Sequence, residues 1–293
     1  MVDPDKLMIK ADKLTKLSLT RWKADWRAAT VLYETAAIEY RTARDNVNAK
    51  IALEKASKGH EMLQSPWDAA KHMETCGNIA KELGNWHEVV DYYRRASELF
   101  TECGRSQPAA DSLAKGARAL QESSPEESVQ LFTDACSLLE EDGRQQMAFD
   151  LYREATSVYI KLERLDDAAA CLLRLGSAAD SCKATNSQCK AYLSAIIVYL
   201  YAHDFKQAEK CYNDCSQVGE FVNSDQNRVA SKLLSAYSDA DVDEIKRLAS
   251  SATVNNLDHV IIRLARKLPT GDVATFKENN ALDEEPIDEN DLT

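Results

Sequence analysis

A stripe of small and aromatic residues recurs along this chain about every 40 positions. Such a period is typical of helical repeat proteins, in which each helix pair buries its apolar face only by stacking on its neighbours. The stripe therefore predicts an all-α, tetratricopeptide-like solenoid of antiparallel helix pairs, a platform for partner proteins. Its members are Trp26, Ala29, Tyr33, Ala36 and Tyr40, then Trp67, Ala70, Cys76, Gly77 and Ala80, then Ala110, Leu113, Gly116, Ala117 and Leu120.

Composition agrees with an extended helical array. The 293 residues include only 9 Gly and 6 Pro, which leaves little room for the turns of a β protein. No run reaches the roughly 18 to 20 apolar residues that a membrane span needs. The first residues lack the basic and apolar regions of a secretory signal, so we expect a cytoplasmic protein whose eight cysteines are thiols.

The cysteines and histidines show no metal or catalytic pattern in the sequence. Cys211 and Cys215 lie four residues apart, with Cys182 and Cys189 upstream, but no CxxC pair or nearby histidine completes a zinc set. We interpret them as small buried side chains. The scattered histidines are His60, His72, His87, His203 and His259. We therefore expect no metal, no cofactor and no enzymatic activity.

Local signals divide the chain into helices. Ser65 before Pro66 predicts a helix start, and Ser124 with Glu127 has the spacing of a capping box. Glycines 84, 104 and 143 predict helix ends, because glycine readily takes the left-handed conformation after a last turn. These signals predict a first helix from Pro4 to Thr20, helix pairs over 24–60, 65–103, 106–141, 145–181 and 186–218, and a helical segment over 224–268.

Three regions follow from this division. Residues 1–220 are predicted to form the solenoid, with an N-terminal helix and loop over 1–23. Residues 221–268 are predicted to form a C-terminal helical bundle that caps it. Residues 269–293 lose the apolar periodicity and become polar and acidic, which predicts a flexible tail.

Two segments, the C-terminal end and the N-terminal loop, carry residues that the packing of helices does not require, so they are candidates for contacts with partners. The acidic C-terminal end carries an apolar Leu292 directly after Asp291, which suits a basic partner, although a merely solvating tail is the alternative. In the N-terminal loop, Leu17, Leu19 and Trp22 lie among lysines and an arginine, a pattern that suits an anionic membrane surface. The alternative for Trp22 is that it packs on the first helix pair.

The chain resembles a known family in two long segments. Trp22-Lys23-Ala24-Asp25-Trp26, running into Ala28-Ala29-Thr30-Val31-Leu32-Tyr33, is similar to the start of the soluble NSF attachment proteins, and to their gamma branch more than their alpha branch. Lys232-Leu233-Leu234-Ser235-Ala236-Tyr237 and Arg263-Leu264-Ala265-Arg266-Lys267-Leu268 are similar to the family's C-terminal helices.

The resemblance implies an adaptor that binds SNARE complexes at membranes and recruits and stimulates the hexameric ATPase NSF. It implies no nucleic acid partner. By position, it implies NSF binding through Asp239, Asp241, Asp288, Glu289, Asp291 and Leu292. It implies SNARE binding through Arg105, and Arg118, Arg153 and Lys161 are predicted to add to this contact although they do not align cleanly with the family. The predicted membrane contact through Leu17, Leu19 and Trp22 rests on the residues of the loop themselves.

Some residues differ from those of the alpha branch at the same positions, and these differences leave other functions open. Asp111 stands where the alpha branch has a lysine, and Ser235 and Ser238 replace acids of that branch. A generic tetratricopeptide-like scaffold for another assembly is the alternative to a SNARE adaptor. An all-helical enzyme would need polar residues that converge in a pocket, and no spacing in the sequence predicts them.

Overall fold

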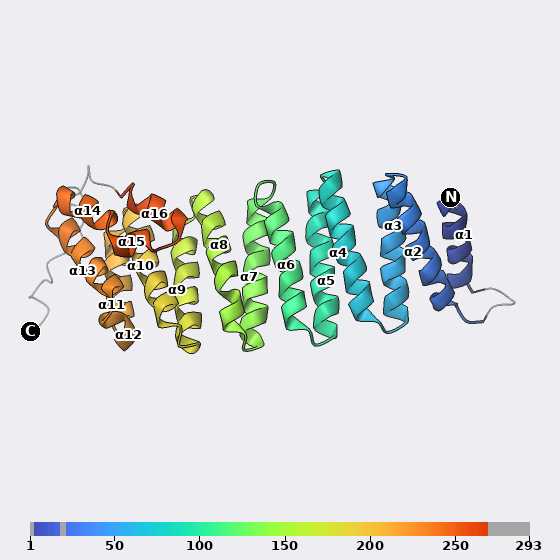
Figure 1. Ribbon diagram of the computed structural model, residues 1–293, viewed down its shortest axis with the longest axis horizontal. Coiled ribbons are helices and arrows are strands. Elements are labelled where there is room, and N and C mark those ends of the chain that lie inside the picture. Colours follow the sequence, from blue (N-terminus) through green and yellow to red (C-terminus); the bar gives the residue numbers. More distant parts are fainter. Residues whose placement is uncertain (1–2, 18–21, 269–293) are drawn as a thin grey trace, which may run out of the picture. The chain divides into compact units, whose positions relative to one another are not determined.

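The computed structural model describes residues 3–17 and 22–268 of the chain. It divides into two compact units, Met1–Leu151 (unit 1) and Tyr152–Thr293 (unit 2). All the regular elements in the described ranges are helices, as Figure 1 shows. The predicted all-α class with packed helix pairs is confirmed. Within those ranges, no helix is both long enough and apolar enough to cross a membrane.

Unit 1 is a row of helices in which each packs against the next along the chain (Figure 1). The predicted pairs over 24–60, 65–103 and 106–141 match three of its helix pairs within a few residues. Its elements are α1 (Pro4–Thr15), α2 (Trp26–Thr42), α3 (Asn46–Met62), α4 (Pro66–Leu83), α5 (Trp86–Glu102), α6 (Ser106–Leu120), α7 (Pro125–Glu141) and the 3-10 helix η1 (Gln145–Ala148).

The first helix is shorter than predicted. It ends at Thr15 rather than Thr20, because Lys16 takes an extended conformation with φ −81° and ψ 132°. The chain then returns toward the helix, where the Asp25 N–H donates to the Leu14 carbonyl at 3.0 Å. The Asp25 carboxylate also caps α2 by accepting from the Ala28 N–H at 3.0 Å. Leu17 is consequently outside the helix.

Many helices are followed by a residue in the left-handed backbone conformation, and the sequence predicts only some of these residues. Gly84, Gly104 and Gly143 have φ of 73°, 65° and 71°, so the predicted left-handed glycines are confirmed. The same conformation occurs at residues other than glycine, where no sequence signal marks it. These are Arg44, Gln64, Glu163, Lys183, His203 and Ala240.

The two predicted serine caps are wrong in detail. Ser124 and Ser65 precede prolines at the first helical positions, as predicted, but neither side chain bonds to the backbone of its helix. The Ser65 hydroxyl instead donates to the Asp68 carboxylate at 2.6 Å. Ser124 has φ −148° and ψ 70°, and its side chain makes no capping bond, so the predicted capping box with Glu127 does not form.

The recurrent stripe forms the core of unit 1. Alanines and tyrosines of the stripe, such as Ala36 and Tyr33, are buried where neighbouring helices approach each other. Trp67 is an exception, because it is 40% exposed. Its ring meets the edge of Phe100 with centroids 4.9 Å apart and planes at 69°. Trp26 is likewise only partly buried.

Unit 2 is organised around α10, which is buried along most of its length between residues 188 and 200. A helix that is apolar all round is expected at the centre of a fold. It packs against α9, α11, α12, α13 and α16. The elements are α8 (Phe149–Lys161), which begins in the last residues of unit 1, α9 (Leu165–Ser181), α10 (Thr185–Tyr201), α11 (Phe205–Cys215), α12 (Gly219–Val222), α13 (Asp225–Ser238), α14 (Val242–Ala249), α15 (Ala252–Asn255) and α16 (His259–Ala265).

One hydrophobic core runs through unit 2 from Ala168 to Leu268. It joins the last predicted solenoid pair to the segment predicted as a cap over 221–268. The division at residue 220 stays a prediction. The predicted tail over 269–293 lies outside the described residues, as does the loop segment 18–21.

Candidate functional site

Asp239 and Asp241 lie on one turn of unit 2. The Asp239 N–H closes α13 by donating to the Ser235 carbonyl at 2.9 Å. Asp241 opens α14, where its carboxylate accepts from the Glu244 N–H at 3.0 Å. Ala240 between them has φ 55°, which makes the reversal tight. Both carboxylates are exposed, so they present negative charge on the same corner.

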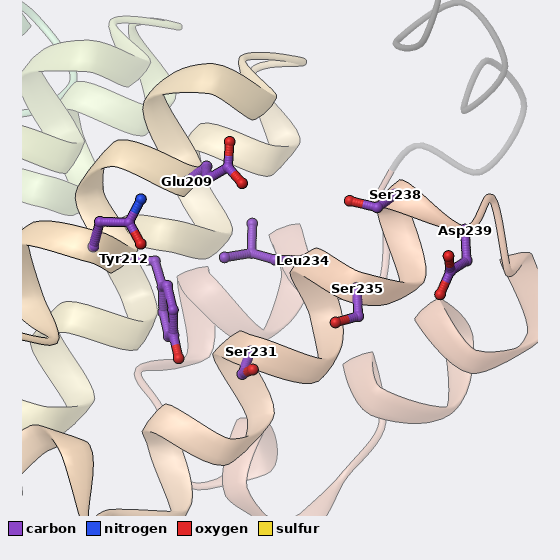
Figure 2. Close-up of a pocket in the computed structure, with 8 residues that line it drawn as sticks. Glu209, Tyr212, Ser231, Leu234, Ser235, Ser238 and Asp239 are labelled. Carbon is purple, nitrogen blue, oxygen red and sulfur yellow. The ribbon is translucent and has the colours of Figure 1, made fainter.

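A shallow pocket between α11 and α13 adjoins this turn (Figure 2). Glu209 and Asp239 are the charged residues of its lining, and serine hydroxyls lie between them along α13. Such a surface offers hydrogen-bond acceptors and negative charge, which suits basic side chains of a partner. Figure 2 shows Leu234 among the residues that line the pocket. The lining residues are Glu209, Tyr212, Asn213, Ser231, Leu234, Ser235, Ser238 and Asp239.

The other residues predicted to bind NSF are in the tail. Asp288, Glu289, Asp291 and Leu292 lie outside the described residues. The structure therefore brings together Asp239 and Asp241 from the predicted set.

The residues predicted to bind SNAREs do not form one cluster within unit 1. Arg105 precedes the first turn of α6, whereas Arg118 is in its last turn. The two residues are 13 positions apart along the helix, which corresponds to about 20 Å. Arg105 is exposed and lines a hollow with Trp67 and Arg144.

Arg144 is a basic residue that the sequence analysis missed. It follows α7, and its guanidinium donates to the Gln107 amide oxygen at 3.3 Å and pairs with the Asp142 carboxylate at 2.7 Å. It reaches the hollow near Arg105 because the turn after α7 lies one repeat beyond the turn after α5. A signal was present, since the Gly143-Arg144 pair repeats Gly104-Arg105.

In unit 2, Arg153 and Lys161 both lie on α8. The Arg153 guanidinium is 3.6 Å from the carboxylate of Asp258, the residue that precedes α16. Arg153 thus links α8 to the last helix of the unit. A SNARE contact through Arg153 would have to compete with this ion pair. Lys161 is exposed at the end of α8.

Several exposed apolar side chains lie at one end of unit 1, while others, such as Val31, Ile38 and Val47, are exposed elsewhere on its helices. Trp22 is 90% and Leu17 68% exposed, so Trp22 does not pack on the first helix pair, whereas Leu19 lies outside the described residues. The α3–α4 turn is at the same end, because successive helices run in opposite directions (Figure 1). It adds exposed Met62 and Leu63, which sequence reasoning missed because they continue the apolar content of a helix.

All eight cysteines are free thiols. Six of them are buried, and Cys103 and Cys182 are partly buried. A hydrogen bond with Cys211, together with burial, raises the pKa of Cys215 far above its usual range. Burial likewise raises the pKa of Cys76 strongly. Thiols held protonated in this way are poor metal ligands, because the thiolate is the form that binds.

Three residues that the sequence left scattered converge in unit 1. The His60 Nε2 on α3 and the His72 Nε2 on α4 lie 2.8 and 2.9 Å from the same Glu34 Oε1 on α2. Their rings are 5.1 Å apart between centroids. Glu34 and His72 are 38 residues apart, close to the repeat period, which is the sequence signal that would have paired them.

Comparison with known proteins decides the family. The soluble NSF attachment protein family model matches residues 2–264. The chain is 64% identical over 291 residues to the gamma-soluble NSF attachment protein of Arabidopsis thaliana, covering 99% of both chains. The chain belongs to the soluble NSF attachment protein family. It is also 28% identical to the gamma-soluble NSF attachment protein of Dictyostelium discoideum, over 91% of this chain and 82% of that one.

The family assignment confirms the resemblance found in the sequence. Among solved structures, aspartyl phosphate phosphatase F from Bacillus subtilis is similar over 96% of this chain and 72% of that chain, with 14% identity and a TM-score of 0.40. That distant likeness adds nothing to the assignment. For a soluble NSF attachment protein, the exposed acids of unit 2 and the exposed basic and apolar side chains of unit 1 are the surfaces to consider for partners.

Proposed function

We propose that this chain is an adaptor that attaches the hexameric ATPase NSF to SNARE complexes, so that ATP hydrolysis by NSF can separate them in intracellular vesicle transport. The observation that carries the proposal is the match over nearly the full length of both chains to a gamma-soluble NSF attachment protein. The adaptor itself catalyses no reaction. It works in the cytoplasm, bound peripherally to membranes.

NSF binding uses the acidic side of the chain. The net charge of −12 steers the adaptor toward a basic surface, and such steering weakens with salt. Asp239 and Asp241 contribute fixed charges on one turn of unit 2. The tail residues Asp288, Glu289 and Asp291 add charge, and Leu292 supplies an apolar anchor. Burying one leucine in a partner pocket contributes about 1.5 to 3 kcal/mol.

SNARE binding uses basic side chains on the helical repeats. Arg105, exposed beside Arg144 at one end of unit 1, is the best placed of the predicted set. Arg118, Arg153 and Lys161 extend the set along α6 and α8. Arginine suits this role because its planar guanidinium can bind a carboxylate through two hydrogen bonds.

Membrane contact uses the end of unit 1 at which α1 and α3 finish, where Leu17, Trp22 and the α3–α4 turn lie. Trp22 and Leu17 are exposed, and Leu19 lies between them in the chain. Lysines beside the loop would meet anionic headgroups, and each cation near such a surface contributes about 1 kcal/mol. Met62 and Leu63 at the same end widen the apolar area.

The NSF contact is tested by co-isolation of NSF on immobilised SNARE complex, at several salt concentrations. Leu292→Ala is expected to reduce the NSF retained at least about tenfold, because the anchor is lost. Asp241→Asn separates charge from structure, since asparagine caps a helix as well as aspartate does. It is expected to weaken NSF retention while leaving the melting temperature unchanged. Asp241→Ala, in contrast, should also destabilise α14, by about 1 kcal/mol.

SNARE complex should still retain each variant of the chain itself. Asp243→Asn, a nearby exposed acid that caps no helix, controls for a general loss of charge. If Leu292→Ala retained NSF as well as the unaltered chain at every salt concentration, the tail contact would be wrong. If the unaltered chain retained neither NSF nor SNARE complex, a scaffold for another assembly would replace the adaptor proposal.

The membrane contact is tested by flotation with vesicles that contain anionic lipid. Trp22→Ser is expected to reduce the bound fraction several-fold, because an exposed indole no longer enters the headgroup region. Trp86→Ser is the control and should float normally. Trp86 starts α5 beside the α4–α5 turn, at the helix ends opposite to those that carry Trp22. Equal flotation of Trp22→Ser and the unaltered chain would contradict the membrane contact.

A further inference from the structure

Glu34, His60 and His72 form a cluster on three successive helices of unit 1. Helices α2, α3 and α4 each supply one side chain, and one ligand atom from each lies within 4.8 Å of the other two. Both imidazole Nε2 atoms face the same carboxylate oxygen, at 2.8 and 2.9 Å. The cluster therefore adds a polar contact between the first helix pair and the second, beside the apolar packing of α2, α3 and α4.

The Glu34 carboxylate is the centre of the hydrogen bonds in this cluster. Burial alone would raise the pKa of Glu34, but hydrogen bonds from His60 and His72 outweigh it and lower that pKa. The His60 Nδ1 lies 4.0 Å from the Asp68 carboxylate, on the side of the ring away from Glu34. That distance is too long for a hydrogen bond, so the Asp68 side chain would have to rotate toward the ring to give the carboxylate that commonly orients a metal-binding histidine.

We propose that Glu34, His60 and His72 bind one divalent transition-metal ion of the zinc class. Two imidazole nitrogens with one carboxylate oxygen are a common zinc donor set, and water completes the tetrahedron. Imidazole also binds copper and nickel, whereas magnesium and calcium require oxygen ligands. The proposal is independent of the NSF and SNARE contacts, and none of these residues belongs to the predicted binding surfaces.

The geometry needs only small movements to accept the ion. Ligand atoms about 2.0 to 2.1 Å from a tetrahedral zinc ion are about 3.3 Å apart. The two contacts to Glu34 would open by roughly half an ångström, and the ligand nitrogens of the two histidines, which lie within 4.8 Å of each other, would close by at most about 1.5 Å. Rotation of the side chains provides movements of this size. The side chains of His60 and His72 are 17% and 19% exposed and that of Glu34 is 34% exposed, so an ion and its water can enter.

Metal binding would clamp the first two helix pairs together. An ion that binds the folded chain and not the unfolded one stabilises the fold by mass action. Because the three ligands come from α2, α3 and α4, the stabilised region is the beginning of unit 1. The thermal transition should therefore rise with zinc concentration.

The test is equilibrium dialysis of the full, metal-stripped chain against zinc chloride, with a melting curve at each concentration. The unaltered chain is expected to bind one zinc ion and to melt at a higher temperature. His72→Gln and Glu34→Gln should each weaken binding at least about tenfold, since even the loss of a residue that only orients a metal ligand typically costs that much. His87→Gln is the matched control, because His87 is a highly exposed histidine outside the cluster.

Two further measurements distinguish zinc bound at this cluster from zinc bound by cysteine thiolates and from a loss of folding in the variants. Without zinc, the variants should have the far-ultraviolet circular dichroism of the unaltered chain, and a fourth variant, His60→Gln, should behave like His72→Gln. Cobalt(II) in place of zinc should give visible bands without the intense sulfur charge-transfer band that thiolate ligands produce. A sulfur band, an unchanged affinity in the folded His72→Gln variant, or no zinc bound by the unaltered chain would overturn the proposal.

Discussion

Replacing Gly176 by valine is expected to lower the free energy of unfolding by about 3 kcal/mol. A β-carbon at position 176 would lie 2.2 Å from Tyr192 Cε1 and 2.7 Å from Cδ1. The tyrosine cannot move away easily, because it is buried and its ring meets Phe221 at 88°, with centroids 5.5 Å apart. Relief of the helical glycine offsets only roughly a few tenths of a kcal/mol, because valine is also a weak helix former.

Urea denaturation followed by circular dichroism measures this loss. Gly219→Val is the matched control, since nothing lies within 4 Å of a β-carbon there. It should change the free energy of unfolding by no more than about 0.5 kcal/mol. Equal stability of the Gly176 and Gly219 variants would mean that α9 and α10 are not as closely packed as described.

Replacing Glu74 by glutamine is expected to destabilise the chain by about 2 kcal/mol at neutral pH. The buried Glu74 carboxylate accepts from the Ser112 hydroxyl and the Lys115 ammonium, each at 2.6 Å. Burial alone would raise the pKa of Glu74, but these bonds outweigh it and hold that pKa below its ordinary value of 4.5. The ionised carboxylate therefore stabilises the folded state.

The pH dependence has a definite sign. Because the pKa of Glu74 is lower in the folded state, its contribution is complete above the ordinary value of 4.5 and is lost as the pH falls through the lower folded pKa. The difference between the unaltered chain and Glu74→Gln should accordingly shrink as the medium is acidified below pH 4.5.

Glu82→Gln is the control for this prediction. Glu82 pairs with Arg41 at 2.7 Å, but its side chain is 47% exposed. The loss there should be at most about 0.5 kcal/mol, because water screens the pair. Chemical denaturation at a series of pH values compares the two variants. A Glu74→Gln difference that stayed constant through the acid range would contradict the assigned role of the charge.

Much of the fold follows from local signals in the sequence. Pro66 and Pro125 stand at helix starts and Gly84 at a helix end, because these residues act through their own backbone geometry. The left-handed residues other than glycine, such as Ala240, leave no such mark, because their side chains do not require this conformation. At Ala240 it accompanies a backbone bond that closes the helix, from the Asp241 N–H to the Ala236 carbonyl at 2.8 Å. The early end of α1 at Thr15 likewise has no local signal, since it accompanies a bond from the Asp25 N–H to the Leu14 carbonyl.

The polar contacts between repeats were missed although their spacing is regular. Glu74 bonds Ser112, Glu34 bonds His72, and Tyr92 bonds Glu54, each pair being 38 residues apart. Equivalent positions on successive helix pairs face each other, so a search at the repeat period would have found all three. The apolar stripe has the same period and was found, because its buried positions are recognisable by their small and aromatic residues as well as by their spacing.

The adaptor function itself is tested most directly by the rate at which NSF and ATP separate a labelled SNARE complex, followed as the loss of energy transfer between two SNAREs. Separation is expected to require this chain. Leu292→Ala is expected to reduce the rate at least about tenfold when the adaptor is limiting. A rate with the chain no greater than the rate without it would mean that the chain is not an adaptor for NSF.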